Sequence, residues 1–185
     1  AVEWLTSEYG QYKLDEPGTC GGQPIDSRKG LFKNRFYTQG ICVMALSEAS
    51  THLADPELRQ KARAAAQIGF DMMSREHLEG GGFNYGGKHT WIKSDGTEAH
   101  RRDNSVSVWC YQGIAAAIAN GLSVPSKDKT AAENWLTWAL GYDGSSGYSS
   151  SSPTSVPRSN PRLTPAVLLC RRLLGHSPTA ADCRA

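Results

Sequence analysis

RRDNSVSVWCYQGIAAAIANGLSV, at residues 101–124, carries the signs of a buried helix. It opens with DNS at residues 103–105, side chains that can accept hydrogen bonds from the free N–H groups of a helix's first turn. It runs without proline to NG at residues 120–121, which commonly ends a helix. Residues 114–119, IAAAIA, are apolar on every side, and such a helix is normally buried on every side. We therefore expect an inner helix with other helices packed around it.

The chain has 185 residues, of which 39% are hydrophobic and 21% charged, as in a folded globular domain. Its formal net charge of +2 is too small to indicate a nucleic-acid partner. No apolar run approaches the roughly 18 residues of a membrane span, and the first residues lack the basic and apolar regions of a signal peptide. We expect one domain over residues 1–185, with a Ser/Pro-rich loop at residues 143–161.

Three segments resemble one another as helices that end in glycine-rich turns. AVEWLT at residues 1–6 matches AENWLT at residues 132–137, and a turn containing glycine and tyrosine follows each of them. The third segment, residues 56–76, is amphipathic and leads into GGGFNYGG at residues 80–87. We expect these three segments to be the outer helices of the fold.

A polar loop and then an apolar segment follow each glycine turn. The apolar segments are residues 36–50, 104–121 and 164–174. Each unit therefore consists of an outer helix, a glycine turn, a loop and an inner helix, and such hairpins stack because one alone cannot bury its apolar face. Since every loop runs from an outer helix to an inner one, all the loops are expected at one rim. The predicted fold is an all-α arc of about three antiparallel helical hairpins.

Five cysteines are spread along the chain, without the CxxC spacing of a zinc site or the even number of a disulfide framework. Cys42, Cys110 and Cys170 fall in the apolar segments, where we expect free and buried thiols. Alignment of the inner helices places Cys42 opposite Cys110. A disulfide between Cys183 and either Cys20 or Cys170 stays open, because it depends on the redox compartment.

The repeat pattern extends over roughly residues 30–175. The segments that carry it are residues 38–49, 81–85, 103–109, 121–125 and 166–171. This pattern resembles the repeat of the prenyltransferase and squalene-cyclase class, in particular the bacterial proteins described as carrying prenyltransferase and squalene-oxidase repeats. The resemblance implies an α/α-toroid fold. A complete ring of that class has about twice as many hairpins, so the resemblance implies half a ring, completed by another copy, another subunit or further sequence.

The catalytic motifs of that class are missing from the sequence. It contains no DxDD cluster, no QxxxGxW turn and no DDxxD motif for magnesium and diphosphate. The zinc transferases of the class place an Asp and a Cys two residues apart, whereas Asp103 and Cys110 are seven apart and His100 precedes both. WCYQ at residues 109–112 is similar to the zinc-binding WCYG of lanthionine cyclases, but their Cys-His pair is absent. We expect no metal and no cofactor.

Arginines stand just before the inner helices. Arg102 precedes Asp103, and the alignment places Arg35 opposite both Asp103 and Arg162. Because the positive ends of three helix dipoles should converge at one rim, free N–H groups and arginines there favour an anion. We predict an anion site that contains these arginines, Asp103 and Gln39. The alternative is that Arg35 and Arg102 pair with Asp103 and acidic loop residues, and only hold the loops.

Two kinds of function fit this sequence. A non-catalytic binding or assembly module is favoured by the missing catalytic motifs and by the half number of hairpins, whose open faces would need a partner subunit or copy. An enzyme acting on an anionic substrate is the alternative, similar to an isoprenoid diphosphate cyclase or transferase, or to a toroid polysaccharide lyase. Its catalytic candidates are Asp103, His100 and Tyr85, with Arg102 stabilising negative charge. We favour the module, with an anionic group bound at the loop rim.

Overall fold

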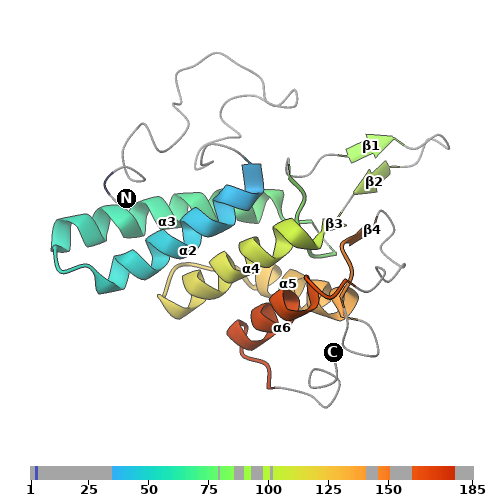
Figure 1. The fold of residues 1–185 in the computed structure, drawn as a ribbon. Coiled ribbons are helices and arrows are strands. Elements are labelled where there is room, and N and C mark those ends of the chain that lie inside the picture. The colour runs from blue at the N-terminus through green and yellow to red at the C-terminus, as the bar shows by residue number, and fades with distance from the viewer. Residues whose placement is uncertain are drawn as a thin grey trace.

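The computed structural model describes residue 3 and residues 35–78, 80–85, 90–92, 98–100, 102–140, 146–150 and 160–177. Within them the fold is all-α, as the sequence predicts (Figure 1). The helices are α2 (Arg35–His52), α3 (Pro56–Glu76), α4 (Asn104–Ala119), α5 (Ser126–Ala139) and α6 (Thr164–Leu173). None of the helices in this described part is long and apolar enough to cross a bilayer.

Two short antiparallel ladders lie beyond one end of the helices (Figure 1). β1 (Thr90–Ile92) pairs with β2 (Glu98–His100), and β3 (Arg102–Asp103) pairs with β4 (Ser149–Ser150). Because β3 leads directly into α4 and β4 follows α5 in the chain, the second ladder ties these two parts of the fold together.

The helix boundaries follow from local chemistry. The side chain of Asp103 caps α4 by accepting the N–H of Ser105 at 2.9 Å, as expected from the sequence. Asp55 caps α3 in the same way, with two N–H groups of the first turn. Gly121 follows α4 at φ 69° and Gly175 follows α6 at φ 98°, left-handed conformations in which glycine carries no steric cost.

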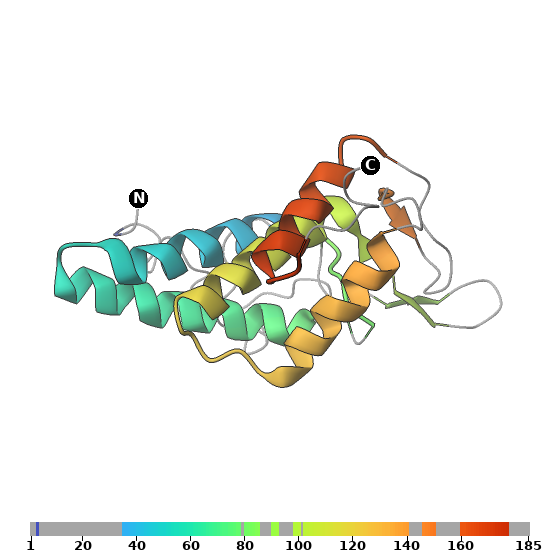
Figure 2. The same ribbon diagram turned by 90° about the horizontal axis from the view of Figure 1, so that it is seen from below.

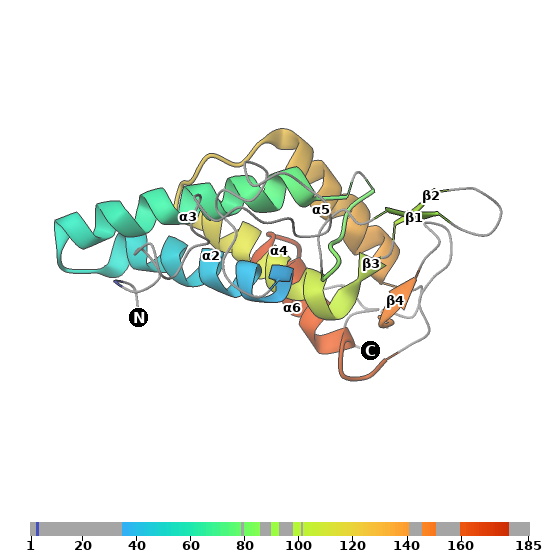
Figure 3. The ribbon, with the colours of Figure 1, turned by 90° about the horizontal axis from the view of Figure 1, so that it is seen from above.

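The three predicted inner helices α2, α4 and α6 lie side by side and run in the same direction, with α4 in the middle (Figures 1 and 2). The outer helices α3 and α5 run the opposite way, and both lie on the same side of this row (Figure 3). Val106, Tyr111, Ile114 and Ala117 of α4 are buried. Residues 104–119 are therefore confirmed as the central helix of the row, but the expected burial on every side is wrong at its C-terminal end, where Ile118 is 39% exposed and Ala119 is exposed as well.

Glycines let α2 and α4 approach closely. A Cβ atom at Gly40 would lie 2.5 Å from the carbonyl carbon of Trp109, a separation that packed atoms do not tolerate. A Cβ atom at Gly113 would lie 2.8 Å from the carbonyl oxygen of Gly40. These two helix-interior glycines cost helix propensity, and the close backbone contact between the two inner helices is what requires them.

The sequence repeat also appears in the structure, as two equivalent backbone hydrogen bonds at the starts of inner helices. The N–H of Phe36 in the first turn of α2 donates to the carbonyl of Tyr85 at 3.3 Å, in the turn after α3. The N–H of Asn104 in the first turn of α4 donates to the carbonyl of Tyr148 at 2.8 Å, in the turn after α5. The inner helices α2 and α4 thus each start against the tyrosine in the glycine turn of the next unit along the chain.

The cysteines of the inner helices are free and buried, as predicted. The thiol of Cys110 donates to the carbonyl of Phe36 on the preceding inner helix, and Cys170 donates to that of Val108. Burial raises the pKa of Cys42 to about 11 and that of Cys170 to about 12. These thiols therefore stay protonated and act as small packing groups.

One part of the predicted alignment is wrong by a single position. Cys170 follows Cys110 by the same number of residues as Thr164, the start of α6, follows Asn104, the start of α4. Arg162 is therefore the counterpart of Arg102, and the hydrophobic Leu163 takes the capping position that Asp103 fills in α4. The predicted outer helix at residues 1–6 lies outside the described residues, apart from the helical Glu3.

Candidate functional site

The first turns of α2, α4 and α6 point toward the same end of the molecule, as the loop-rim prediction requires (Figure 1). At the start of α4, Asp103 is completely buried, and its Oδ1 accepts both the N–H of Ser105 at 2.9 Å and the Ser105 hydroxyl at 2.6 Å. The carboxylate of this catalytic candidate is thus used to cap the helix. Because it is buried and already accepts two hydrogen bonds, the Asp103 carboxylate is poorly placed to take a proton from a substrate.

Tyr85, a second catalytic candidate, is linked to Asp103 through Ser105. Its hydroxyl lies 3.0 Å from the Ser105 hydroxyl and 3.3 Å from the hydroxyl of Tyr148, which the sequence did not mark as a site residue. The hydrogen bond to Ser105 lowers the pKa of Tyr85, but the bond to Tyr148, burial and the charge of Asp103 outweigh it and raise the pKa above its ordinary value. Tyr85 is therefore a hydrogen-bond donor at neutral pH and a poor base.

Within the described part of the structure, three other predicted site residues are not seen in contact with the cluster of Asp103, Ser105 and Tyr85. The backbone of His100 pairs with Thr90 between β1 and β2, and the position of its side chain lies outside the described structure, as does that of Arg35. Arg162 is exposed, and its backbone N–H donates to the side chain of Asn160 at 3.0 Å. A catalytic cluster of His100 with Tyr85 and Asp103 therefore has no geometric support from the described residues.

Gln39 does not belong to the predicted anion site. It is completely buried, and its side-chain amide donates to the carbonyl of Gly69 at 2.8 Å, which joins α2 to α3. The amide is polar and stands near the start of an inner helix in the sequence, but the rotation of α2 turns it toward the outer helix. Its position between two packed helices assigns it to the core.

Among the arginines of the predicted anion site, Arg102 is the one whose side-chain contacts the structure describes in detail. Its guanidinium carbon lies 5.2 Å from the centroid of the Trp138 ring, and its side chain crosses the turn at Gly80 and Gly82. Half-burial lowers its pKa from the ordinary value, without removing its charge at neutral pH. It forms no ion pair with Asp103 or with any other described carboxylate. Of the alternative role, the pair of Arg102 with Asp103 is thus not observed, while pairs that involve Arg35 or acidic loop residues lie outside the described side chains.

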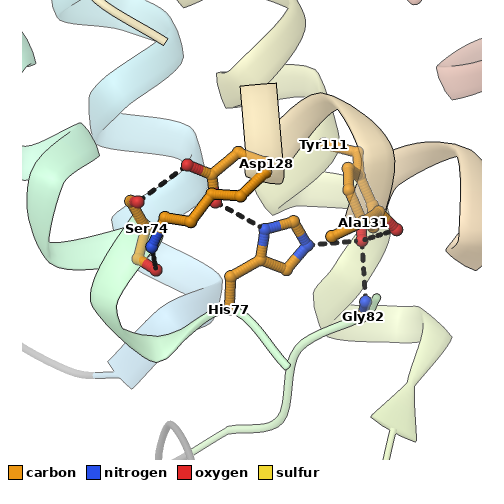
Figure 4. Close-up of polar contacts among 7 residues, drawn as sticks. Ser74, His77, Gly82, Tyr111, Asp128 and Ala131 are labelled. Atoms are coloured by element: carbon orange, nitrogen blue, oxygen red, sulfur yellow. Dashed lines mark hydrogen bonds and ion pairs between the residues drawn. The ribbon is translucent and has the colours of Figure 1, made fainter. Parts of the chain in front are cut away.

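A buried polar network that the sequence did not reveal joins α3, α4 and α5 (Figure 4). His77 Nδ1 lies 2.8 Å from Asp128 Oδ1, and the other Asp128 oxygen accepts the hydroxyl of Ser74 at 2.7 Å. His77 Nε2 lies 2.8 Å from the hydroxyl of Tyr111, which also accepts the N–H of Gly82 at 2.7 Å. Every polar atom drawn on these side chains has a partner, as buried groups require.

Aromatic rings enclose this network. The His77 ring stacks on Phe83 with centroids 4.5 Å apart, and Tyr111 stacks on Trp135 at 4.1 Å. The Trp135 indole N–H donates to Asn104 at 2.8 Å, which extends the polar contacts to the start of α4. The network therefore connects the glycine turn, the start of α5 and the middle of α4 in one packed unit.

The charges in the network are set by burial and by its hydrogen bonds. Burial alone raises the pKa of Asp128, but hydrogen bonds from His77 and Ser74, together with the charges of His77 and Lys127, outweigh it and lower the pKa. Burial raises the pKa of Tyr111 well above its usual range. Asp128 is therefore a carboxylate that orients the His77 ring toward Tyr111, an arrangement also found in proton relays.

This Asp-His-Tyr arrangement is closed to substrates. His77, Asp128 and Tyr111 are at most 5% exposed, so no reacting group can approach the imidazole or the phenol. Among the residues with described side chains, no group of three or more metal-binding residues occurs. The arrangement is well suited to fixing three helices, and no described opening connects it to a substrate.

No protein-family model matches this sequence, and neither the characterised proteins nor the solved structures contain a significant match to it.

Proposed function

We propose that this chain is a non-catalytic assembly module whose inner-helix row packs against a second copy. The observation that carries the proposal is on α6, where Leu169 and Leu173 lie one helical turn apart and are 48% and 50% exposed. Two half-exposed leucines at this spacing form a stripe that helices normally bury against another helix.

The neighbouring inner helices carry related apolar groups. Ile41 and Trp109 are partly exposed, and each of them directly precedes a buried cysteine, as Leu169 does on α6. The ring of Tyr37, which is 38% exposed, lies 5.5 Å from the Trp109 ring. The apolar positions therefore recur along all three inner helices, which supports an extended contact surface.

A second copy suits this surface because its hairpins have the packing pattern that the repeat already uses. Within one chain α4 packs against α2 on one side and α6 on the other, while the main contacts of α6 among the described helices are with α4 and α5. A hairpin from a second copy would give α6 the neighbour that α4 has. If the chain resembles half of a toroid ring, as its repeat suggests, a second copy is the partner expected to complete it.

The enzyme alternative has less support. Asp103, a catalytic candidate, and Asp128, the carboxylate of the buried network, are both buried and hydrogen-bonded within the protein. An acid or base must reach a substrate proton within hydrogen-bonding distance. The buried positions of these groups are better explained by helix capping and by helix-to-helix connection.

The test is the native mass of the chain, measured by light scattering over a range of concentrations. We expect a dimer or larger assembly for the wild type and monomers for Leu169→Gln with Leu173→Gln. Burial of apolar area stabilises by roughly 25 cal/mol per Å², so the loss of two half-buried leucines should weaken association at least about tenfold. Far-UV circular dichroism should stay unchanged, because both side chains are exposed in the single chain.

The matched control is Thr130→Gln with Asn134→Gln, which changes two exposed positions one turn apart on the outer helix α5. This variant should keep the wild-type mass. A wild-type chain that stays monomeric at high concentration would overturn the proposal, and so would equal effects of the two double variants.

A further inference from the structure

The side chain of Arg102 has a charge that the described structure does not neutralise. Asp103 is occupied with the cap of α4, and Asp128 is occupied with His77 and Ser74. No described residue accepts a hydrogen bond from the Arg102 guanidinium or forms an ion pair with it. A half-buried guanidinium with five N–H donors and no acceptor is unusual, because burial of a charge without a partner is costly.

The backbone around Arg102 is shaped to hold this side chain. A Cβ atom at Gly80 would lie 2.0 Å from Nη2 of Arg102, and one at Gly82 would lie 3.3 Å from its Cγ. Gly82 also has φ 93°, a conformation that other residues rarely adopt. The glycine turn therefore gives the side chain of Arg102 a fixed course, and the position of its charge is built into the fold.

Trp138, the aromatic partner of Arg102, also has no hydrogen-bond acceptor among the described residues. The guanidinium lies over the ring of Trp138 at 5.2 Å from its centroid, a cation–π contact that orients the cation but accepts no hydrogen bond. Trp138 is only 9% exposed, and its indole N–H has no hydrogen-bond partner among the described residues. Buried indole N–H groups usually donate to an acceptor, so a bound group with an acceptor atom would satisfy the N–H of Trp138.

We propose that Arg102 and the indole N–H of Trp138 form a binding site for a small oxyanion, a carboxylate or phosphate group. The two donors belong to side chains in contact, since the Arg102 guanidinium lies over the Trp138 ring, and a guanidinium fork binds two oxygens of such a group at once. The charge of the anion compensates that of Arg102, and its oxygens supply acceptors that neither side chain finds among the described residues. The site is independent of self-association, since neither residue lies on the leucine stripe of α6.

The counterpart position in the next repeat provides the control. Arg162 precedes α6 as Arg102 precedes α4, but it is exposed and no ring contact with it is found among the described residues. Isolated exposed arginines bind small anions weakly because the solvent screens them. Removal of Arg162 should therefore leave binding at Arg102 intact.

The experiment is a titration of the full chain with inorganic phosphate, and separately with acetate, at constant ionic strength. The side-chain N–H signals of the five tryptophans are followed by NMR, and the Trp138→Phe spectrum assigns that of Trp138. We expect a saturable downfield shift of the Trp138 signal. Arg102→Gln should abolish saturation, and Arg102→Lys should weaken binding about tenfold through loss of the fork. Arg162→Gln should bind as the wild type does.

Trp138→Phe replaces the indole by a smaller phenyl ring that has no N–H, so it tests the indole donor while an aromatic face remains beside Arg102. Phosphate affinity, measured by calorimetry, should fall about tenfold. Wild-type affinity in this variant would overturn the role of Trp138. A linear, unsaturated response of the wild type, or an equal loss in Arg162→Gln, would overturn the site as a whole. Saturation by acetate but not phosphate, or the reverse, identifies which oxyanion the site accepts.

Discussion

The imidazole Nδ1 of His77 lies 2.8 Å from a carboxylate oxygen of Asp128, although 51 positions separate the two residues in the chain. His77 ends α3, and Asp128 stands in the first turn of α5. The contact therefore joins the two outer helices directly and, through Tyr111, connects both of them to the central inner helix. We regard it as the connection on which the relative position of the two hairpins depends.

Substitution of Asp128 by Asn should destabilise the fold by about 3 kcal/mol, because His77 and Ser74 would each lose an ionised acceptor in a buried site. Urea denaturation measures the loss. Asp71→Asn on the exposed face of α3 is the matched control and should change stability by less than about 0.5 kcal/mol. Equal effects of the two substitutions would contradict the role of the network.

Acid should weaken the fold through the same carboxylate. The pKa of Asp128 is below its ordinary value of 3.8, so its contribution to stability is complete above about pH 4 and is lost as the pH falls through the lower folded-state pKa. Urea midpoints between pH 6 and pH 2.5 should show this fall. In Asp128→Asn the decline should be shallower, since one ionisation no longer differs between folded and unfolded chains. A decline of unchanged slope would argue against this assignment.

Removal of one buried hydroxyl should stabilise the protein. The Ser47 hydroxyl on α2 is completely buried and has no hydrogen-bond partner among the described residues. Ser47→Ala should therefore raise the free energy of unfolding by about 1 kcal/mol. The same change at Ser107, whose hydroxyl accepts the N–H of Phe83 at 2.9 Å, should lower it by about 1 to 3 kcal/mol. Thermal unfolding of the two variants measures both changes. Relative to the wild type, the unfolding temperature should rise for Ser47→Ala and fall for Ser107→Ala.

A single methyl group at Gly40 should disturb the contact between the inner helices. Its Cβ would meet the Trp109 backbone at 2.5 Å, and backbone atoms cannot rotate away as a side chain can. Gly40→Ala should cost about 2 to 3 kcal/mol despite the better helix propensity of alanine. Gly175→Ala, where no atom lies within 4 Å, should cost only about 1 kcal/mol for the left-handed backbone. A Gly40 variant as stable as the wild type would mean that the helices separate freely.

The central helix could be predicted from sequence because its signals are local. The Asp103 cap and the Gly121 stop act within one or two turns, and the structure confirms both of them. The apolar run at residues 114–119 correctly predicted a helix but not its burial on every side, because Ile118 and Ala119 are exposed at its end. The repeat predicted the order of outer and inner helices for the same reason, since each unit carries its own turn and its own apolar face. The free, buried cysteines also follow from their helical surroundings.

The candidate site was harder to predict, because side-chain partners depend on how the helices rotate and pack. Gln39 looked like a rim residue, yet the orientation of α2 buries it against Gly69 of α3. The repeat of tyrosines after glycine turns was visible in the sequence and could have marked Tyr148 beside Tyr85. Nothing in the spacing of His77 and Asp128 could have paired them.

The amino-acid sequence alone determined that the chain is helical, where the inner helix α4 begins and ends, and that its hairpins repeat, because caps, glycine stops and apolar periodicity act over a few residues. Tertiary structure alone decided that His77 meets Asp128, and that Arg102 lies over Trp138 without a described carboxylate. These contacts join residues far apart in the chain. They exist only after the helices pack, when burial decides which polar groups find a partner and which keep an unused donor.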